Sequence, residues 1–180
     1  MSNTYKYKNL EQLLAGSNWQ AADEETTKLT FQIDSVNIET YVEFQRALSA
    51  VSSKIDQFPL VELRHIDQLW RTYSGDHFGF AVQWQKYQKI LAEYKQNPQG
   101  VEAKYPIHMS GIWTPMTALA IEIGWLSRGA IEWSFDLKTF YSLDAPRGHL
   151  PSVGKQELGD AFHHGYLLSM IFYRLQQKYF

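Results

Sequence analysis

The sequence predicts an all-α fold, and two observations support that prediction. Apolar side chains recur at the spacing of one helix face in six segments spread along the 180 residues. No segment shows the sustained alternation of apolar and polar residues that is typical of a strand, and only short extended pieces are expected near Ile131–Phe135. With 44% hydrophobic and 20% charged residues, the chain is expected to form one globular domain around its own core.

The composition excludes several classes of protein. The 17 Lys and Arg residues nearly balance the 19 Asp and Glu residues without any long basic run, so no nucleic-acid partner is expected. The absence of cysteine excludes disulfides, zinc ribbons, a cysteine nucleophile and any cofactor attached through a thioether. A bound haem or bilin would therefore be held non-covalently. The first residues lack an apolar core, so no secretory signal is expected, and the cytoplasm or the plastid stroma is the expected compartment.

The stretch Phe58–Gln83 organises the rest of the chain. It reads as an amphipathic helix, a Ser-Gly-Asp turn and the start of a second helix. Pro59 suits the first turn of the first helix, and Asp76 is expected to cap the second one. Gly79 stands between two phenylalanines and permits close approach by a neighbouring helix or by a flat ligand, although a plain aromatic core is the favoured interpretation. The apolar face of the first helix consists of Leu63, Ile66, Leu69, Trp70 and Tyr73.

Three helices are expected before this stretch. Asn9 is expected to cap the first helix and Gly16 to end it. Ser17 and Gln20 form the signature of a capping box at the start of the second helix. The acidic run Asp23–Glu25 is expected to favour the positive end of the helix dipole and to form a solvated face. A third helix is predicted from the apolar residues Tyr41, Phe44, Leu48, Val51 and Ile55.

Beyond the organising stretch, one further helix is expected at the C-terminus. The helix that begins near Gln83 should end before Pro98, and Gln96–Lys104 is expected to be a loop. Tyr105–Ile121 holds no charged residue but is too short and too interrupted for a membrane-spanning helix, so a buried segment or an apolar flap is expected. Turn signals are frequent over residues 124–154, and an amphipathic helix is expected from about residue 155 to the end.

Catalytic motifs are absent: the sequence has no nucleophile elbow, P-loop, dinucleotide-binding fingerprint or HExxH zinc motif. Two short patterns, Glu62-x-x-His65 and Asp160-x-x-His163, would each place both side chains on one helix face, as in di-iron carboxylate proteins. A di-iron site needs two Glu-x-x-His motifs and a glutamate from each of two more helices, and here one motif has aspartate. Ordinary surface or capping roles are therefore favoured, and a bundle metalloenzyme is left as an alternative.

Three blocks of sequence, spread over residues 10–151, share their pattern with a known family. The first block is LEQLLAGSNWQAADEETT, Leu10–Thr27. The second contains Phe58-Pro59, Ile66-Asp67-x-Leu69-Trp70, Ser74 and Phe78-Gly79-Phe80-x-Val82-Gln83. The third joins Ile123-Gly124-Trp125 to Leu143-x-Ala145-Pro146-x-Gly148-His149-Leu150-Pro151. Together and in this order they resemble the genomes-uncoupled-four family, the tetrapyrrole-binding regulators of magnesium chelatase.

The resemblance implies an all-helical fold shaped like a cupped hand, whose apolar cleft holds protoporphyrin IX, magnesium protoporphyrin IX or, in some members, an open-chain bilin. It implies a regulator of chlorophyll biosynthesis without catalytic residues, which contacts the large porphyrin-binding subunit of magnesium chelatase in cyanobacteria or plastids. The structural core of the family motif would be Trp70, Phe78, Gly79 and Phe80. Carried over by position, the ligand-binding residues would be Trp125, Leu143, Pro146, Gly148, His149 and Leu150.

The residue chemistry fits such a ligand. A porphyrin is a flat apolar ring with two propionates, so it needs apolar walls, to which Phe140 would contribute, and a cation at the rim. Arg147 lies inside the third block, and Arg128 and Lys138 are nearby in sequence. His149 could ligate a central metal, but a Gly-His-Leu-Pro turn more often uses its histidine to hold the loop by hydrogen bonds, and that role is favoured.

The predicted organisation has three parts. A tail covers residues 1–8, a tetrapyrrole-binding helical domain covers 9–154 with an insertion around 96–122, and an added C-terminal helix covers 155–180. The insertion and the added helix depart from the family pattern, as does a chain that starts directly at the first block. They leave open a divergent member that acts as a protein-interaction or bilin-binding module unrelated to the chelatase. At most a peripheral association with membranes is expected.

Overall fold

The computed structural model describes residues 6–31, 49, 52–105, 114–126, 140–152 and 161–176, apart from the side chains of residues 31, 114 and 161–166. These residues form helices, turns and bends, and no strand is present among them. The prediction of an all-α fold is confirmed. Within the same part of the chain, no helix is both long enough and apolar enough to cross a membrane.

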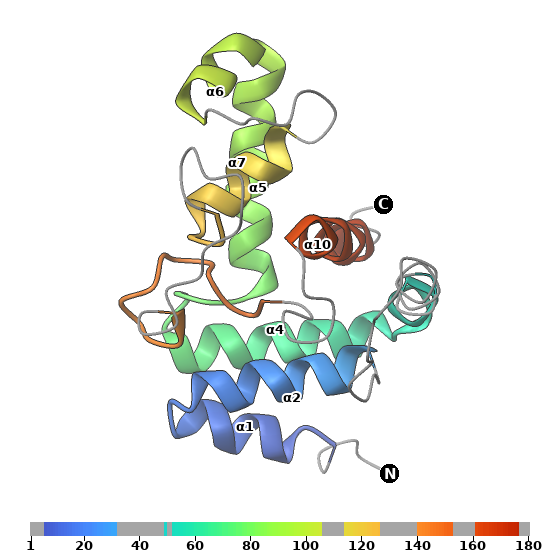
Figure 1. Cartoon of the computed structure of the whole chain (residues 1–180). Coiled ribbons are helices and arrows are strands. Elements are labelled where there is room, and N and C mark those ends of the chain that lie inside the picture. The colour runs from blue at the N-terminus through green and yellow to red at the C-terminus, as the bar shows by residue number, and fades with distance from the viewer. Residues whose placement is uncertain are drawn as a thin grey trace, which may run out of the picture.

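Three helices form the lower layer of the molecule in Figure 1. They are α1 (Lys8–Ala15), α2 (Trp19–Phe31) and α4 (Leu60–Ser74). α1 packs against both α2 and α4. The apolar residues expected on this helix are Leu10, Leu13 and Leu14, of which Leu10 and Leu14 are buried and Leu13 is half-buried. The layer therefore follows from the helical periodicity of the first two sequence blocks.

The remaining helices stand on this layer. α5 (Phe80–Gln96) rises from the end of α4, and both α6 (Pro98–Lys104) and α7 (Thr114–Glu122) pack against it. α10 (Ala161–Gln176) lies in the angle between α4 and α5 and contacts both of them as well as α7 (Figure 1). The corner between α4 and α5 is thus the centre of the architecture, as the organising stretch predicted.

The turn between α1 and α2 differs from its prediction in detail. α1 ends at Gly16 as predicted, but it begins one residue before Asn9, so the predicted cap by Asn9 is wrong. The predicted capping box is also wrong, because Ser17 takes a left-handed φ of 54° that reverses the chain. Asn18 caps α2 instead, and its Oδ1 accepts a hydrogen bond from the Ala21 amide at 3.4 Å.

A carboxylate from α4 caps α5. Oδ1 of Asp67 accepts a hydrogen bond from the Ala81 amide at 2.9 Å. Asp76 instead pairs with Arg71, with Nε and Oδ1 2.6 Å apart, so the predicted cap by Asp76 is wrong. The two helices approach closely because Gly79, at φ 136°, has no side chain: a Cβ there would lie 2.9 Å from Oδ1 of Asp67. Of the two uses expected for Gly79, the close approach of a neighbouring helix is present in the structure.

Aromatic rings join α2 to the corner between α4 and α5. Trp70 and Phe78 are fully buried. Trp19 stacks on Trp70 with ring centroids 6.1 Å apart and meets Phe78 edge-on at 5.5 Å. Nε1 of Trp70 donates to Oγ1 of Thr26 at 2.9 Å, so the polar edge of the buried indole has a partner. The aromatic core that the sequence favoured across the helix pair therefore extends to α2.

The prediction of a loop over Gln96–Lys104 is wrong, because most of this segment forms α6. Asn97 precedes the helix, and its Oδ1 accepts a hydrogen bond from the Gly100 amide at 2.9 Å. Pro98 occupies the first helical position, where its missing N–H costs nothing. The Asn-Pro pair is a helix-start signal, and the proline and glycine content of the segment concealed it.

α7 and α10 complete the core. Within the uncharged segment, Met116 and residues 118–120 are buried, so the buried segment expected there is present in its described part. On α10, Phe172 packs against Trp84 at 5.1 Å and Tyr87 at 5.5 Å between ring centroids. Nη2 of Arg174 donates to the carbonyl oxygen of Phe58 at 2.8 Å, which ties α10 to the start of α4.

Several expectations concern residues outside the described ranges. Residues 52–57 are helical and Ile55 is buried, but the other apolar residues predicted for the third helix lie at 41–51. The extended pieces near Ile131–Phe135 also lie outside the description, as do the start predicted for the C-terminal helix near residue 155 and the second half of the di-iron pattern at Asp160.

Candidate functional site

Most residues predicted to bind a ligand lie on one segment, residues 140–152, named here the 140–152 loop. It runs beside the corner between α4 and α5 (Figure 1). The loop divides into a tip, residues 143–147, which is exposed except at Ala145, and a buried inner arm, residues 148–152. The predicted site residues are therefore split between two environments, which the following contacts define.

The inner arm is bonded to the corner through its backbone. The amide of Gly79 donates to the carbonyl oxygen of Leu150 at 2.9 Å. Nε2 of Gln83 donates to the carbonyl oxygens of Gly148 and Pro151, both at 2.9 Å. Gln83 is fully buried, and its side-chain amide provides the hydrogen-bond donor that these two buried loop carbonyl oxygens need.

A buried carboxylate on α2 holds the end of the inner arm. The amide of Ser152 donates to Oδ1 of Asp23 at 2.7 Å, and the Ser152 hydroxyl donates to Oδ2. Asp23 is only 4% exposed and Ser152 only 2%. The prediction that the acidic run forms a solvated face is therefore wrong for Asp23, because a loop far away in sequence covers it. Its neighbours Glu24 and Glu25 are half-buried.

The tip is tied to the turn between α4 and α5 but remains exposed. Nε of Arg147 donates to the carbonyl oxygen of Asp76 at 3.0 Å. Nε2 of His77 lies 2.7 Å from the carbonyl oxygen of Ala145, and it is the donor because a carbonyl oxygen only accepts. Leu143 is 51% exposed, and Pro146 and Arg147 are exposed as well.

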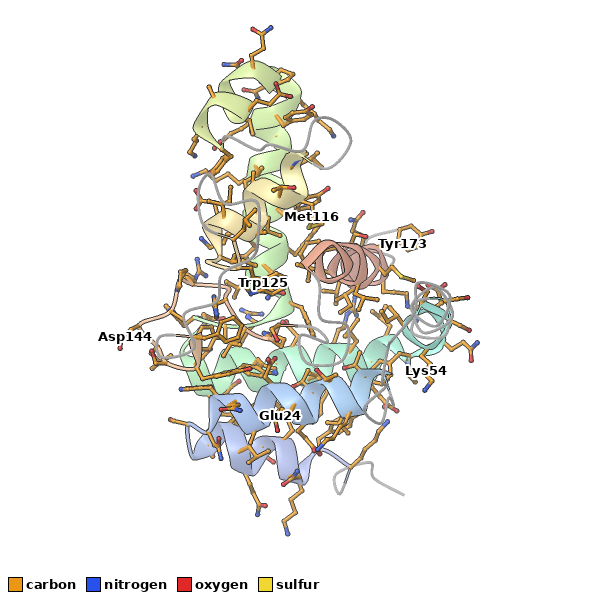
Figure 2. All side chains as sticks on the ribbon, in the orientation of Figure 1. Glu24, Lys54, Met116, Trp125, Asp144 and Tyr173 are labelled. Carbon is orange, nitrogen blue, oxygen red and sulfur yellow. The ribbon has the colours of Figure 1, made fainter. Side chains whose placement is uncertain are left out.

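Trp125 and His149 form a frame behind the tip. Nε1 of Trp125 donates to the carbonyl oxygen of His149 at 2.7 Å, and Nδ1 of His149 donates to that of Ile123 at 2.6 Å. The His149 ring meets Phe140 edge-on at 3.9 Å. All three side chains are buried. Trp125 lies in the interior and Asp144 of the tip at the outer edge (Figure 2). His149 therefore holds the loop by hydrogen bonds, which is the role that the sequence favoured.

The backbone just after α7 lies very close to the tip. Gly124 takes a φ of 76°, and a Cβ there would lie 2.8 Å from Cγ of Pro146. The Gly-Trp pair of the third sequence block is thus needed for packing on Pro146. Arg128 and Lys138, expected at the rim, lie outside the described residues.

The first di-iron pattern has other partners. Glu62 accepts hydrogen bonds from Nζ of Lys6 and the hydroxyl of Tyr7. The Tyr7 ring meets His65 edge-on at 4.9 Å, so both residues of the pattern hold the start of the chain against α4. In the part of the chain that the structure describes, no group of three or more residues is placed to hold a metal ion.

Sequence reasoning did not identify four residues that shape this site: Asp23, His77, Gln83 and Ser152. Two of them, Asp23 and Gln83, stand inside the first two sequence blocks. A polar residue within a predicted apolar helix face is the signal that marks Gln83, since a buried amide needs a partner. No comparable signal marks Asp23, because it belongs to an acidic run at a helix start.

Burial raises the pKa of the Asp67 carboxyl, and hydrogen bonds from Ala81 and Phe80 and the charge of Arg71 only partly oppose it. A carboxyl whose pKa is raised on folding contributes stability that is fully present below its unfolded value of about 3.9 and is lost as pH rises through the folded value. We therefore expect Asp67→Asn, which can still accept from the Ala81 amide, to gain stability relative to the parent protein as pH rises from about 4 to 7.

Urea unfolding of both proteins across that pH range would measure the difference. The expected result is a free-energy difference that moves in favour of Asn as pH rises. Parallel stability curves would show that the Asp67 carboxyl titrates alike in the folded and unfolded chains, and would contradict the expectation.

A family model for GUN4-like proteins matches residues 1–164. The chain belongs to the GUN4-like family. The match includes all three sequence blocks and the whole 140–152 loop and ends within α10. The resemblance found in the sequence is confirmed, and the GUN4-like family is one of tetrapyrrole-binding regulators.

The fold of this GUN4-like chain is similar to the ligand-free structure of Arabidopsis thaliana GUN4. The TM-score is 0.57 at 22% sequence identity, over 96% of this chain and 94% of that one. At this identity the likeness shows a shared fold. Comparison with curated proteins gave no sequence match.

Proposed function

We propose that this GUN4-like protein binds a porphyrin-type tetrapyrrole, protoporphyrin IX or magnesium protoporphyrin IX, and regulates magnesium chelatase without catalysing a reaction itself. The observation that carries the proposal is the family match over residues 1–164, which contains the whole 140–152 loop. Binding would be non-covalent because the chain has no cysteine. The proposed partner is the large porphyrin-binding subunit of the chelatase, and the proposed compartment is the cytoplasm or the plastid stroma.

The chemistry of the tip supports a ligand of this kind. Leu143 and Pro146 offer exposed apolar surface beside the guanidinium of Arg147. Within the described part of the chain, the only hydrogen bond of Arg147 runs from Nε to the carbonyl oxygen of Asp76, so its terminal nitrogens can bind a propionate. We propose that Leu143 and Pro146 contact the ring and that Trp125, Phe140, Gly148, His149 and Leu150 hold the loop behind it.

The affinity expected for such a site can be estimated. Burying roughly 400 Å² of macrocycle at about 25 cal/mol per Å² gives about 10 kcal/mol of gross stabilisation. Association costs of at least about 4 kcal/mol leave at most about 6 kcal/mol, which corresponds to a Kd of roughly 40 µM. An ion pair with Arg147 worth roughly 1 kcal/mol would lower that Kd to about 10 µM. Because the inner arm is already bonded to α2 and α5, little of that energy is needed to order the loop.

Quenching of tryptophan fluorescence by deuteroporphyrin, its magnesium form and biliverdin tests the proposal. The six tryptophans provide the signal. We expect saturable quenching by a porphyrin at concentrations of about 10 µM, and about fivefold weaker binding by Arg147→Ala, since an exposed ion pair contributes roughly 1 kcal/mol. Quenching by biliverdin alone would favour the bilin-binding alternative.

Two controls separate propionate binding from other effects of the substitution. Lys95→Ala removes an exposed cation near the far end of α5, about 22 Å along the helix from its start, and should leave the affinity unchanged. The dimethyl ester of deuteroporphyrin should bind parent protein and Arg147→Ala equally, because it carries no propionate charge. If none of the three tetrapyrroles quenches the parent protein, the proposed function is wrong and a protein-interaction module becomes the better reading.

The regulatory part of the proposal needs a separate measurement. Purified magnesium chelatase would be assayed for magnesium insertion with and without this protein. We propose a faster rate at limiting porphyrin, which Arg147→Ala should reduce in proportion to its weaker binding. A protein that binds porphyrin but leaves the rate unchanged would be a tetrapyrrole-binding module unrelated to the chelatase.

A further inference from the structure

Asp23 stands out among the buried groups because it lies on a helix that contributes no residue to the tip. It sits in the second turn of α2, within the lower helical layer. Its carboxylate is nevertheless occupied by both polar groups of one loop residue, the amide and the hydroxyl of Ser152. A buried carboxylate is costly unless it is hydrogen-bonded, so this arrangement is maintained only while the loop end stays in place.

The contact differs from the other bonds of the inner arm. Gly79 and Gln83 bond the carbonyl oxygens of residues 148, 150 and 151, and a carbonyl oxygen accepts over a broad range of directions. Ser152 is held at two atoms by the two oxygens of one carboxylate, which fixes both its position and its orientation. The tip lies only five residues before this anchor.

We infer that Asp23 is a positioning residue for the binding loop: its carboxylate fixes Ser152, and through the inner arm it sets where Leu143, Pro146 and Arg147 stand. The inference rests on the proposed function, since it takes the tip to be the part that contacts the tetrapyrrole. It extends the site into the lower helical layer, because α2 then determines the affinity of a ligand that it does not touch.

Hydrogen exchange in the full chain tests the anchoring step without any ligand. In Asp23→Ala we expect the Ser152 amide to exchange roughly ten- to a hundredfold faster, as befits the loss of a charge-assisted hydrogen bond, while amides in the middle of α5 keep their rates. Ser152→Ala breaks only the hydroxyl contact and should give a smaller increase. Asp23→Asn keeps an acceptor for the amide and should restore most of the protection.

A matched variant on the same helix controls for the loss of a carboxylate. Glu24 is the next residue, and its Oε1 accepts a hydrogen bond from Gln20 at 3.2 Å within α2. Glu24→Ala should leave the exchange of Ser152 unchanged. Equal exchange of Ser152 in Asp23→Ala and in the parent protein would overturn the inference, because the carboxylate would then not hold the arm.

Porphyrin binding tests the positioning step. Asp23→Ala should weaken deuteroporphyrin binding roughly three- to tenfold. This is the effect expected if the loop takes up its binding conformation for only a third to a tenth of the time. The same substitution should have a smaller effect in Arg147→Ala, because displacing the tip then costs only the ring contacts of Leu143 and Pro146. A general loss of stability would instead weaken both proteins alike.

The outcomes separate the inference from the proposed function. Faster exchange of Ser152 with unchanged porphyrin affinity would overturn the positioning role and leave the proposed function standing. A parent protein that binds no tetrapyrrole would overturn the proposed function, and with it the role of Asp23 towards a ligand, whatever the exchange shows. Faster exchange together with weaker binding that depends on Arg147 supports both.

Discussion

Replacing Trp70 by alanine is expected to lower the free energy of unfolding by about 3–5 kcal/mol. The indole is fully buried between Trp19 and Phe78, and its Nε1 donates to Thr26, so the substitution leaves both a cavity and a buried hydroxyl that loses a partner. Urea unfolding followed by circular dichroism measures the loss. We expect the slope of the transition to stay the same, because the fold as a whole is retained.

A substitution one turn further along α4 provides the control. Tyr73 is 36% exposed, and its hydroxyl donates to Glu11 at 3.0 Å on the surface. Tyr73→Ala removes a similarly large ring but should cost less than about 1 kcal/mol, as surface substitutions usually do. Equal losses for the two variants would show that the aromatic cluster does not form the core of the fold.

Gly79→Ala is expected to be the second most damaging change, with a loss of about 2–3 kcal/mol in the free energy of unfolding. Its φ of 136° and ψ of 156° belong to a region that is open almost only to glycine. The added methyl would also lie 2.8 Å from Cγ of Arg71 and 2.9 Å from Oδ1 of Asp67. Relief of that contact would move the Asp67 carboxylate away from the Ala81 amide that it caps.

Gly75→Ala is the matched control, four residues earlier in the same turn. Gly75 has a φ of 61°, and a Cβ there would meet no atom within 4 Å. Only the cost of the left-handed conformation remains, about 1 kcal/mol for an alanine. Chemical denaturation of both variants compares them. A Gly75→Ala loss as large as that of Gly79→Ala would mean that crowding by Asp67 and Arg71 contributes nothing.

The parts of the fold that sequence predicted well depend on local signals. The α4 face is correct except for Tyr73, which is exposed because it lies at the surface end of that face. The face, the Ser-Gly-Asp turn and the stop before Pro98 each lie within a few residues of the structure that they specify. Gly16 likewise ends α1 as predicted. Backbone conformation and helix periodicity are encoded in neighbouring residues, so a single sequence is enough to find them.

The errors share a different cause. Asp76 was expected to cap α5 because it is adjacent in sequence, whereas the cap comes from Asp67 on the preceding helix, which packs alongside. Asp23 was assigned to a solvated face because its neighbours are acidic, whereas a loop 129 residues away buries it. Tertiary contacts decided both cases, and spacing along a chain does not reveal which distant segment will cover a helix.

The candidate site was found only in part. The third sequence block selected residues 143–151, a segment that the structure bonds to α2 and α5, together with Trp125. The sequence could not distinguish the exposed residues of this block from the buried residues that hold the loop, because both kinds occur within the same short stretch. Leu143 and Arg147 are exposed, while Trp125, His149 and Leu150 are buried among backbone partners.

The anchor between Asp23 and Ser152 also orders events during synthesis of the protein. Ser152 follows Asp23 by 129 positions, which take about 6 to 26 seconds to translate at about 5–20 residues per second. Throughout that interval α2 exists without the segment that will cover its carboxylate, so Asp23 faces water while the lower helices can already pack. The helical layer can therefore form well before the loop is fixed, and the last quarter of the chain adds the loop to a helical body that is already folded.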